Sequence, residues 1–283
     1  MKVFLATLLS LFFLVSCSCG GGTQTFVPTI TPAVTQDDGS PSARELRRQL
    51  VAGDIERTVS VSLDCSPVEG VKIYGLRSRP SVAMDGRGTG VIVRSKLNRS
   101  YIFTAAHVVL ADKAYRDAFT CSIYVNRNEN LGNKSTRITA EIFAHDERRD
   151  IAVLSVEEDL GIATDLELSP FTGEDAFAVG YPVQLASPGT KRLSVTMGTI
   201  ATLNVPAGNN VSKEGSFHRT TAQLYFGNSG GGIWSIEGKL IGIADALYAN
   251  DEGVSYEGYY YIKPVGEYLS MLKDQWKYWE VFN

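Results

Sequence analysis

From Thr58 onward, apolar and polar residues form short alternating runs that glycine, proline, asparagine and aspartate interrupt. Runs of this kind, rich in β-branched and aromatic residues, are typical of β-strands separated by turns. About twelve strands are predicted: Val59–Leu63, Val71–Tyr74, Thr89–Arg94, Tyr101–Thr104, Ser122–Val125, Ile138–Phe143, Ile151–Ser155, Ala176–Val179, Ser194–Leu203, Gly232–Ser235, Leu240–Ala244 and Tyr259–Ile262. No long helical pattern separates them, which favours a β-sandwich or β-barrels over an alternating α/β fold.

Two segments carry a helical period instead. Residues 43–57 form a short amphipathic pattern, which we expect to pack at the edge of the domain. From Val265 to Phe282, apolar residues recur near helical spacing, from Leu269 and Leu272 to the two tryptophans that follow. This predicts a C-terminal helix that caps a barrel, with its tryptophans and tyrosines packed against the core. Contact between these aromatic residues and a membrane is the alternative.

The N-terminus carries an export pattern. Lys2 precedes the apolar run Val3–Val15, which suits the h-region of a signal peptide and is too short to span a bilayer. The run ends in Leu14-Val15-Ser16-Cys17, which resembles a bacterial lipobox, and this predicts a lipoprotein signal peptide over residues 1–16 with a lipid on Cys17. The protein is then exported and anchored to the bacterial cell envelope. The alternative is an ordinary signal peptide cut near residues 18–20, which gives a soluble secreted protein.

The segment after the lipobox-like sequence is predicted to be a flexible linker. Residues 20–42 are rich in glycine, threonine, proline and serine and have no periodicity that would bury a face. We therefore expect residues 17–57 to form a flexible tether with a short helix, and residues 58–283 to form the folded domain.

Composition narrows the function classes. The chain has 283 residues, of which 44% are hydrophobic and 20% charged, and these values exclude a mainly disordered, collagen-like or coiled-coil protein. Its 27 basic and 31 acidic residues give a net charge of −4, which argues against a nucleic-acid partner because such proteins need clustered lysine and arginine. After the signal peptide, no apolar stretch is long enough for a membrane span.

The four cysteines divide into two pairs. Cys17 and Cys19 belong to the lipobox and the tether, which leaves Cys65 and Cys121. In an oxidising compartment these two can form a disulfide, which would close a loop of roughly 55 residues and be worth on the order of 4 kcal/mol in the chain-entropy model. Two buried thiols are the alternative.

Histidine is the usual general base near neutral pH, and the chain has three: His107, His145 and His218. His107 stands in Thr-Ala-Ala-His-Val-Val, where a predicted strand ends, whereas His145 and His218 are expected to be structural or surface residues. No His-Glu-x-x-His or zinc-type cysteine spacing occurs, so we expect no metal site.

A glycine-rich loop, Gly227-Asn228-Ser229-Gly230-Gly231, formally fits the Gly-x-Ser-x-Gly nucleophile elbow of α/β-hydrolases. Those enzymes place their histidine after the serine, and no histidine follows Ser229. The subtilisin order would require a suitable aspartate before one of the three histidines. The order His107, Asp150, Ser229 fits the chymotrypsin-like arrangement directly, with Asp150 at the entry to an apolar strand.

Taken together, four segments resemble the chymotrypsin-fold serine endopeptidases, and specifically their HtrA/Deg-type branch: TAAHVV (104–109), HDERRDIAVL (145–154), AVGYP (178–182) and GNSGGGIW (227–234). Further matches are GRGTGVIV (86–93) and GKLIGI (238–243), and the resemblance covers roughly residues 71–265. It implies an all-β fold of two six-stranded antiparallel β-barrels with the C-terminal helix, a protein or peptide substrate, and no cofactor.

The resemblance also implies roles for the loop and the triad. Ser229 would be the nucleophile, His107 the general base, and Asp150 the residue that orients the imidazole. Backbone N–H groups of the loop at Gly227, Asn228 and Ser229 would form the oxyanion hole. Pancreatic-type proteases carry an acid at the position of Asn228 that pairs with a new N-terminus, so we do not expect activation by that route.

The primary substrate pocket would, by the same resemblance, be lined by Gln223, Leu224, Asp245, Ala246, Leu247 and Gly258. Gln223 stands near the position where trypsin-like enzymes carry an acid, so a strong preference for arginine or lysine is not expected, although Asp245 leaves this open. The residues after the last predicted strand are too few for a PDZ domain, so we expect an HtrA/Deg-type protein without one.

The leading interpretation is therefore a lipid-anchored serine endopeptidase. Two alternatives stay open: a catalytically silent protease-fold protein with a binding or structural role, and an esterase that uses the same triad. The oligomeric state and the natural substrate are not indicated by the sequence.

Overall fold

The computed structural model describes residues 43–69, 86–111, 118–127, 136–183, 192–206, 214–249 and 255–283. These residues belong to one compact unit, Pro41–Asn283. The predicted signal peptide, Cys17, most of the tether and the predicted strand Val71–Tyr74 lie outside the described residues. Within the described ranges, no helix has the length and apolar character that crossing a membrane requires.

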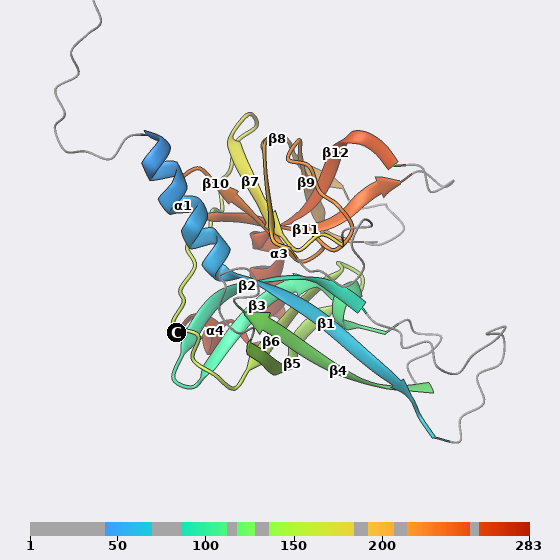
Figure 1. Ribbon diagram of the computed structural model, residues 1–283. Coiled ribbons are helices and arrows are strands. Elements are labelled where there is room, and N and C mark those ends of the chain that lie inside the picture. The colour runs from blue at the N-terminus through green and yellow to red at the C-terminus, as the bar shows by residue number, and fades with distance from the viewer. Residues whose placement is uncertain are drawn as a thin grey trace, which may run out of the picture. The chain divides into compact units, whose positions relative to one another are not determined.

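Twelve strands of the described chain form two closed six-stranded antiparallel barrels (Figure 1). The first barrel has the order β1-β2-β3-β6-β5-β4 and comprises β1 (Thr58–Pro67), β2 (Gly86–Lys96), β3 (Arg99–Ala105), β4 (Phe119–Arg127), β5 (Thr136–Asp146) and β6 (Ile151–Val156). The second has the order β10-β11-β12-β9-β8-β7 and comprises β7 (Asp175–Gly180), β8 (Ser194–Pro206), β9 (Ser216–Thr220), β10 (Gly232–Ser235), β11 (Leu240–Ala249) and β12 (Ser255–Pro264). The predicted all-β fold with two six-stranded barrels is confirmed.

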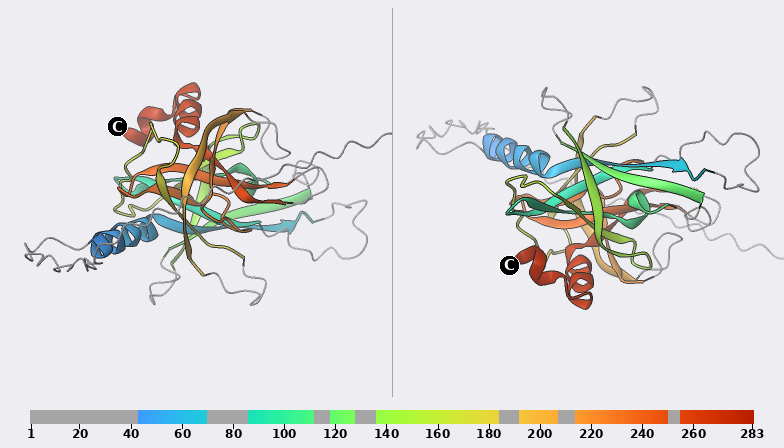
Figure 2. Two further views of the ribbon diagram at one scale, coloured as in Figure 1. Left: turned by 90° about the horizontal axis from the view of Figure 1, so that it is seen from above. Right: turned by 90° about the horizontal axis from the view of Figure 1, so that it is seen from below.

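Four helices complete the described chain: α1 (Ala43–Arg57), α2 (Ala106–Val109), α3 (Val265–Asp274) and α4 (Tyr278–Phe282). Figure 2 shows α1 and the C-terminal helices outside the strands. The predicted C-terminal helix is present but interrupted at Trp276, whose φ is +59°. Leu269 and Leu272 are buried as expected, whereas Trp276 is 90% exposed and Trp279 is 68% exposed. The expectation that the tryptophans pack in the core is therefore wrong, because the break turns them away from the barrel.

Two elements were not indicated by the sequence pattern. β9 is short, and its sequence Ser-Phe-His-Arg-Thr contains a single apolar residue, Phe217, so this strand has no recognisable alternation of apolar and polar residues. α2 is a single turn, too short to show a helical period, and it directly follows β3. Both matter here, because α2 carries His107 and β9 leads into the serine loop.

The apolar core has a part inside each barrel and a part between them. The part between the barrels, the seam, contains Phe103 of the first barrel, Phe177 and Trp234 of the second, and Tyr268 of α3. The rings of Phe103 and Tyr268 stack with their centroids 4.5 Å apart. Because the seam is apolar, the barrels are held in one arrangement and the groups at their junction are shielded from water.

The cysteine pair left open by the sequence is joined. Cys65 on β1 and Cys121 on β4 are directly opposite in the antiparallel register and form a disulfide. The bond ties together two strands that are already neighbours in the first barrel.

Helix α1 packs onto the barrels through Val51 and Ile55, and it brings a buried acid with it. Asp54 has no exposed surface; Arg57 donates to one carboxyl oxygen at 3.3 Å, and the other oxygen has no partner in the described chain. Burial raises the pKa of Asp54 to about 7, although the nearby Arg57 opposes the shift.

We predict that Asp54→Asn stabilises the protein more at pH 8 than at pH 5. Since the pKa of Asp54 is raised above its unfolded value, the native state binds the proton more tightly, and wild-type stability is lost as pH rises towards about 7. Asparagine does not titrate, so the melting temperature of the variant relative to wild type should rise by at least about 2–4 °C between the two pH values, as expected for about 1 kcal/mol in a domain of this size. Asp175→Asn, at an exposed carboxylate, is the control. An equal difference at both pH values would contradict the prediction.

Candidate active site

His107 and Asp150 meet because β3 and β6 are paired. Ala105, the last residue of β3, lies opposite Ile151, the first residue of β6. His107 follows Ala105 by two residues in α2, and Asp150 directly precedes Ile151. The backbone N–H of Ala106 donates to the carbonyl of Asp150 at 3.2 Å, which closes this corner of the first barrel. Sheet register thus delivers the two side chains, 43 residues apart in sequence, to one place.

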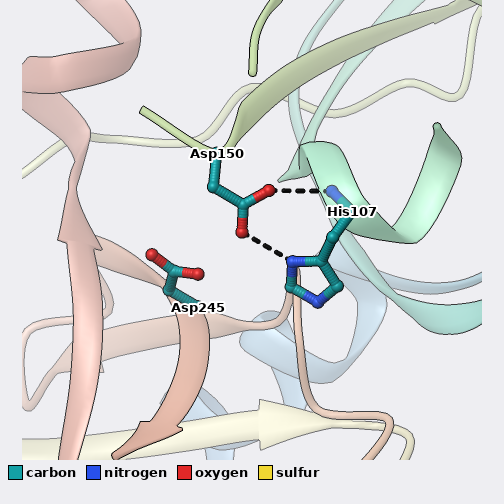
Figure 3. Close-up of side chains that lie close together, drawn as sticks. All are labelled: His107, Asp150 and Asp245. Atoms are coloured by element: carbon teal, nitrogen blue, oxygen red, sulfur yellow. Dashed lines mark hydrogen bonds and ion pairs between the residues drawn. The ribbon is translucent and has the colours of Figure 1, made fainter. Parts of the chain in front are cut away.

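The two residues share two hydrogen bonds (Figure 3). The His107 backbone N–H donates to one carboxyl oxygen of Asp150 at 2.8 Å, and Nδ1 of its ring lies 2.6 Å from the other oxygen. Asp150 is 3% exposed, whereas the His107 side chain is 39% exposed. Because Asp150 accepts at Nδ1, the ring carries its proton there and leaves Nε2 as an acceptor. This is the tautomer that a general base needs.

Asp150 also has an uncommon backbone conformation, with φ at +56°. Aspartate tolerates this left-handed region better than bulkier residues do, although it carries a small strain. The preceding turn is held by Asp146, whose carboxyl oxygen accepts the backbone N–H groups of Arg148 and Arg149. These hydrogen bonds hold the turn that sets the direction of the Asp150 carboxylate.

The Ser229 loop lies between the barrels and bonds to both. On the second-barrel side, the Gly230 N–H donates to the Ala244 carbonyl at 2.7 Å. On the first-barrel side, the Thr89 N–H donates to the Ser229 carbonyl at 2.8 Å. Glycine is required at position 230, because φ is +86° and an added Cβ would lie 1.9 Å from the Thr89 carbonyl oxygen.

Thr89 connects this loop to its surroundings through its side chain as well. Its hydroxyl donates to the carbonyl of Gly227 at 2.8 Å and accepts the Tyr181 N–H at 2.9 Å. Its own carbonyl accepts from the Thr104 hydroxyl at 2.8 Å. Thr89 was missed from the sequence, although it stands between Gly88 and Gly90 in the glycine-rich start of a predicted strand.

The Ser229 hydroxyl is bonded away from the histidine ring. It donates to the backbone carbonyl of Asp245 at 3.0 Å, and no hydrogen bond joins it to His107 among the described residues. Ser229 is half-buried. Catalytic hydrogen bonds are often long or differently directed before a substrate is bound, so this arrangement is compatible with a nucleophile that turns towards the base.

The loop offers two backbone donors. Within the described part of the chain, the N–H groups of Gly227 and Ser229 donate to no acceptor. The N–H of Asn228, by contrast, donates to the Tyr225 carbonyl at 2.9 Å. The expectation that Asn228 adds a third donor is therefore corrected, because its N–H closes the turn that shapes the loop.

The Asp245 side chain is buried, and its assignment to the substrate pocket stays a prediction. Its side chain is 2% exposed, and one atom each of Asp245, Asp150 and His107 lies within 4.8 Å of the others (Figure 3). The backbone of β11 turns this carboxyl inward, towards the apolar seam. The carboxyl group faces Asp150 (Figure 3).

The other pocket residues are placed less fully. Gln223 is exposed and its carbonyl accepts from the Thr196 hydroxyl, while Leu224 is 5% exposed and belongs to the second-barrel core. Ala246 and Leu247 lie in β11 and Gly258 lies in β12, but their side-chain surroundings are outside the described residues. The pocket assignment stays a prediction.

The remaining histidines are apart from the triad. His145 is exposed on β5, and its carbonyl accepts from Gln275. His218 is 5% exposed on β9, accepts the Asn204 N–H at its Nδ1, and lines a cavity that also reaches Glu267 on α3. Burial lowers the pKa of His218, which favours the neutral ring.

Histidine and aspartate side chains can coordinate divalent metals, and His107, Asp150 and Asp245 lie close enough to one another to do so. His107 and Asp150 already use their facing atoms for each other. A cation would have to replace that bond, so the arrangement suits an acid–base pair better than a metal centre.

The sequence of residues 88–243 matches the family described as "Trypsin-like peptidase domain". Among curated proteins, it is 28% identical over 212 residues to the serine protease Do-like HtrA of Lactococcus lactis subsp. cremoris, covering 71% of this chain and 48% of that protein. It is 27% identical over 221 residues to the periplasmic pH-dependent serine endoprotease DegQ of Escherichia coli, covering 76% of this chain and 43% of that protein. The chain thus spans about half the length of these relatives.

Solved structures show the same fold. A variant of the HtrA-type protease AlgW with decapeptide superposes with a TM-score of 0.63 at 20% sequence identity, covering 83% of this chain and 68% of that one. The family match covers more than half of the sequence and includes His107, Asp150 and Ser229. The chain therefore belongs to the trypsin-like peptidase domains, with HtrA-type proteases among its relatives.

Proposed function

We propose that this protein is a serine endopeptidase that cleaves peptide bonds with Ser229, His107 and Asp150. The observation that carries the proposal is the doubly hydrogen-bonded His107–Asp150 pair beside a loop that presents Ser229 and two N–H groups. The names of the curated relatives, serine protease and serine endoprotease, support the same activity.

The mechanism follows from which atoms are available. The Ser229 hydroxyl leaves the Asp245 carbonyl and turns to Nε2 of His107, which takes its proton as the oxygen attacks the scissile carbonyl. Asp150 stabilises the resulting imidazolium through the Nδ1 bond. The N–H groups of Gly227 and Ser229 then bind the oxyanion, each contributing about 3 kcal/mol in sites of this type. His107 returns the proton to the leaving amine, and water repeats the sequence on the acyl-enzyme.

One observation favours the alternative of a catalytically silent protein: the Ser229 hydroxyl donates to Asp245 and not to His107. Such a protein would keep the fold as a peptide-binding or structural component. An esterase with the same triad is distinguished by its substrate alone.

The envelope location is the second part of the proposal. The apolar run Val3–Val15 ends at a lipobox-like sequence, and we propose residues 1–16 as a lipoprotein signal peptide and Cys17 as the lipidated residue. Residues 17–57 then carry the tether and α1, and the protease domain occupies residues 58–283, where β1 begins. Relatives named periplasmic agree with export. Secretion without an anchor is the alternative.

Ser229→Ala should abolish proteolysis without altering the fold. The change removes one hydroxyl from a half-buried turn, so stability should stay within about 0.5 kcal/mol of wild type. Wild type should react with a fluorophosphonate probe at Ser229, and the variant should not.

Asp150→Asn should lower kcat by about 10⁴-fold through the wrong imidazole tautomer, as triads of this type show.

Assays with a folded protein, a peptide and a short ester distinguish the alternatives. Turnover of the ester alone would favour the esterase. Absence of both turnover and labelling in the correctly folded wild type would favour the silent protein.

Thr89→Val should damage both stability and activity, whereas Thr89→Ser should preserve them. Valine has the same shape but leaves the Gly227 carbonyl and the Tyr181 N–H buried without their Thr89 hydroxyl partner. Each such group costs about 1–3 kcal/mol. Urea unfolding and kcat measure the two effects. Equal behaviour of the valine and serine variants would show that the hydroxyl does not hold the loop.

Cys17→Ser should release the protein from membranes or leave it unprocessed, while the catalytic domain keeps its activity. Stable anchoring needs more than one acyl chain, each held at roughly 0.8 kcal/mol per buried CH₂, so loss of the lipidated cysteine removes the attachment. Cys19→Ser is the matched control and should remain in the membrane fraction. A mature N-terminus downstream of Cys17, or no incorporation of labelled lipid, would mean that the protein is simply secreted, and would leave the triad assignment untouched.

A further inference from the structure

Asp245 contacts the triad in a way that the proposed mechanism does not use. Its carboxyl group is 2% exposed, and both of its oxygens lack a hydrogen-bond partner in the described structure. Figure 3 shows this carboxyl facing Asp150, with the His107 ring on the other side of Asp150. Its backbone carbonyl, in the same residue, accepts the Ser229 hydroxyl. Asp245 is therefore adjacent to every member of the triad.

Two carboxyl groups this close in an apolar seam do not both ionise. A buried carboxylate without hydrogen bonds is costly, and a second negative charge beside it adds repulsion. Asp150 accepts two hydrogen bonds from His107, which stabilise its charged form. Asp245 accepts none at its side chain. The negative charge thus belongs on Asp150, and the proton on Asp245.

The charged and titratable groups around Asp245 agree with this assignment. Burial, and then the charge of Asp150, raise the pKa of Asp245 well above its ordinary value. Lys263 on β12 is buried, and its positive charge opposes the rise in the pKa of Asp245 but is a smaller influence than burial and the Asp150 charge. Tyr268 on α3 donates its hydroxyl proton to the Thr104 carbonyl, so it does not supply a hydrogen bond to Asp245.

We propose that Asp245 is a positioning residue whose carboxyl group stays protonated at neutral pH and donates a hydrogen bond to Asp150. If both groups were carboxylates, neither could donate a hydrogen bond to the other, and the two negative charges would repel. A single proton shared between them allows a hydrogen bond and makes the contact attractive. Asp150 is then held by His107 from one side and by Asp245 from the other. The effect on catalysis rests on the proposed protease function, whereas the location of the proton does not.

The proton can be located without any catalytic readout. In the Ser229→Ala protein at pH 8, infrared spectroscopy should show the C=O band of a protonated carboxyl group, and this band should disappear in the Ser229→Ala, Asp245→Asn protein. Asp54→Asn in the same background is the control for the other strongly buried acid, and it should leave the Asp245 band in place. Absence of a band that depends on Asp245 would overturn the proposal.

The positioning role is tested by variants that differ only in the donor. Asp245→Asn keeps a neutral group with an N–H donor, so its kcat should stay within a few-fold of wild type. Asp245→Ala removes the donor and should lower kcat by about 10²-fold with little change in KM, because the misplacement affects Asp150 and His107 and not substrate binding. Melting curves confirm that each variant is folded, and if the alanine variant is not, Asp245→Val serves in its place.

The outcomes separate the two proposals. Asp245→Asn as impaired as the alanine variant would mean that an ionised carboxylate is needed, which contradicts the proposal. Proteolysis by wild type without the infrared band overturns the Asp245 assignment and leaves the protease function standing. The band without any proteolysis or probe labelling overturns the function and leaves the proton on Asp245.

Discussion

The contact between Thr89 and the serine loop is the interaction on which the site depends. Thr89 lies in the first barrel, yet its N–H, its hydroxyl and its carbonyl all bond at the junction, to Ser229, Gly227, Tyr181 and Thr104. His107 and Asp150 belong to the first barrel and the nucleophile loop to the second. The Thr89 contacts therefore fix the serine loop against the barrel that carries the base. Since Thr89 has no exposed surface, water does not compete for these bonds, and their geometry is kept.

Burial of polar groups in the seam has two consequences in this molecule. At Thr89 every buried group has a partner, so burial adds rigidity. At Asp54 and Asp245 partners are incomplete, so burial instead favours the neutral acid. Burial thus holds the loop at Thr89 and favours the protonated form of Asp54 and Asp245. A charged group in such a place acts strongly on its neighbours because little water screens it.

The sequence was sufficient for the parts that depend on motif order and local pattern. The strand runs favoured a sandwich or barrels, and the resemblance carried by the motifs implied the two six-stranded barrels that the structure has. The motif order put His107 and Asp150 together, and these two residues are in contact. Contacts between distant segments were beyond it: the pattern of β9 is too short to read, and nothing local says that the carboxyl of Asp245 points inward to Asp150. Asn228 shows the same limit, because which N–H of a glycine-rich loop remains available depends on the turn that the loop adopts. The tryptophans show that helical spacing alone does not decide burial when a helix is broken at Trp276.

The bond between Ser229 and Asp245 bears on whether the described site is an active one. Turning the hydroxyl to His107 would exchange one neutral hydrogen bond for another. A net hydrogen bond contributes about 1 kcal/mol, far less than the 8 kcal/mol or more by which enzymes typically lower a barrier. The orientation of His107 by Asp150 is already in place, and the N–H groups of Gly227 and Ser229 have no acceptor among the described residues. The resting direction of one hydroxyl is therefore weak support for a silent site, and the arrangement of the remaining groups favours a protease that completes its triad when a substrate binds.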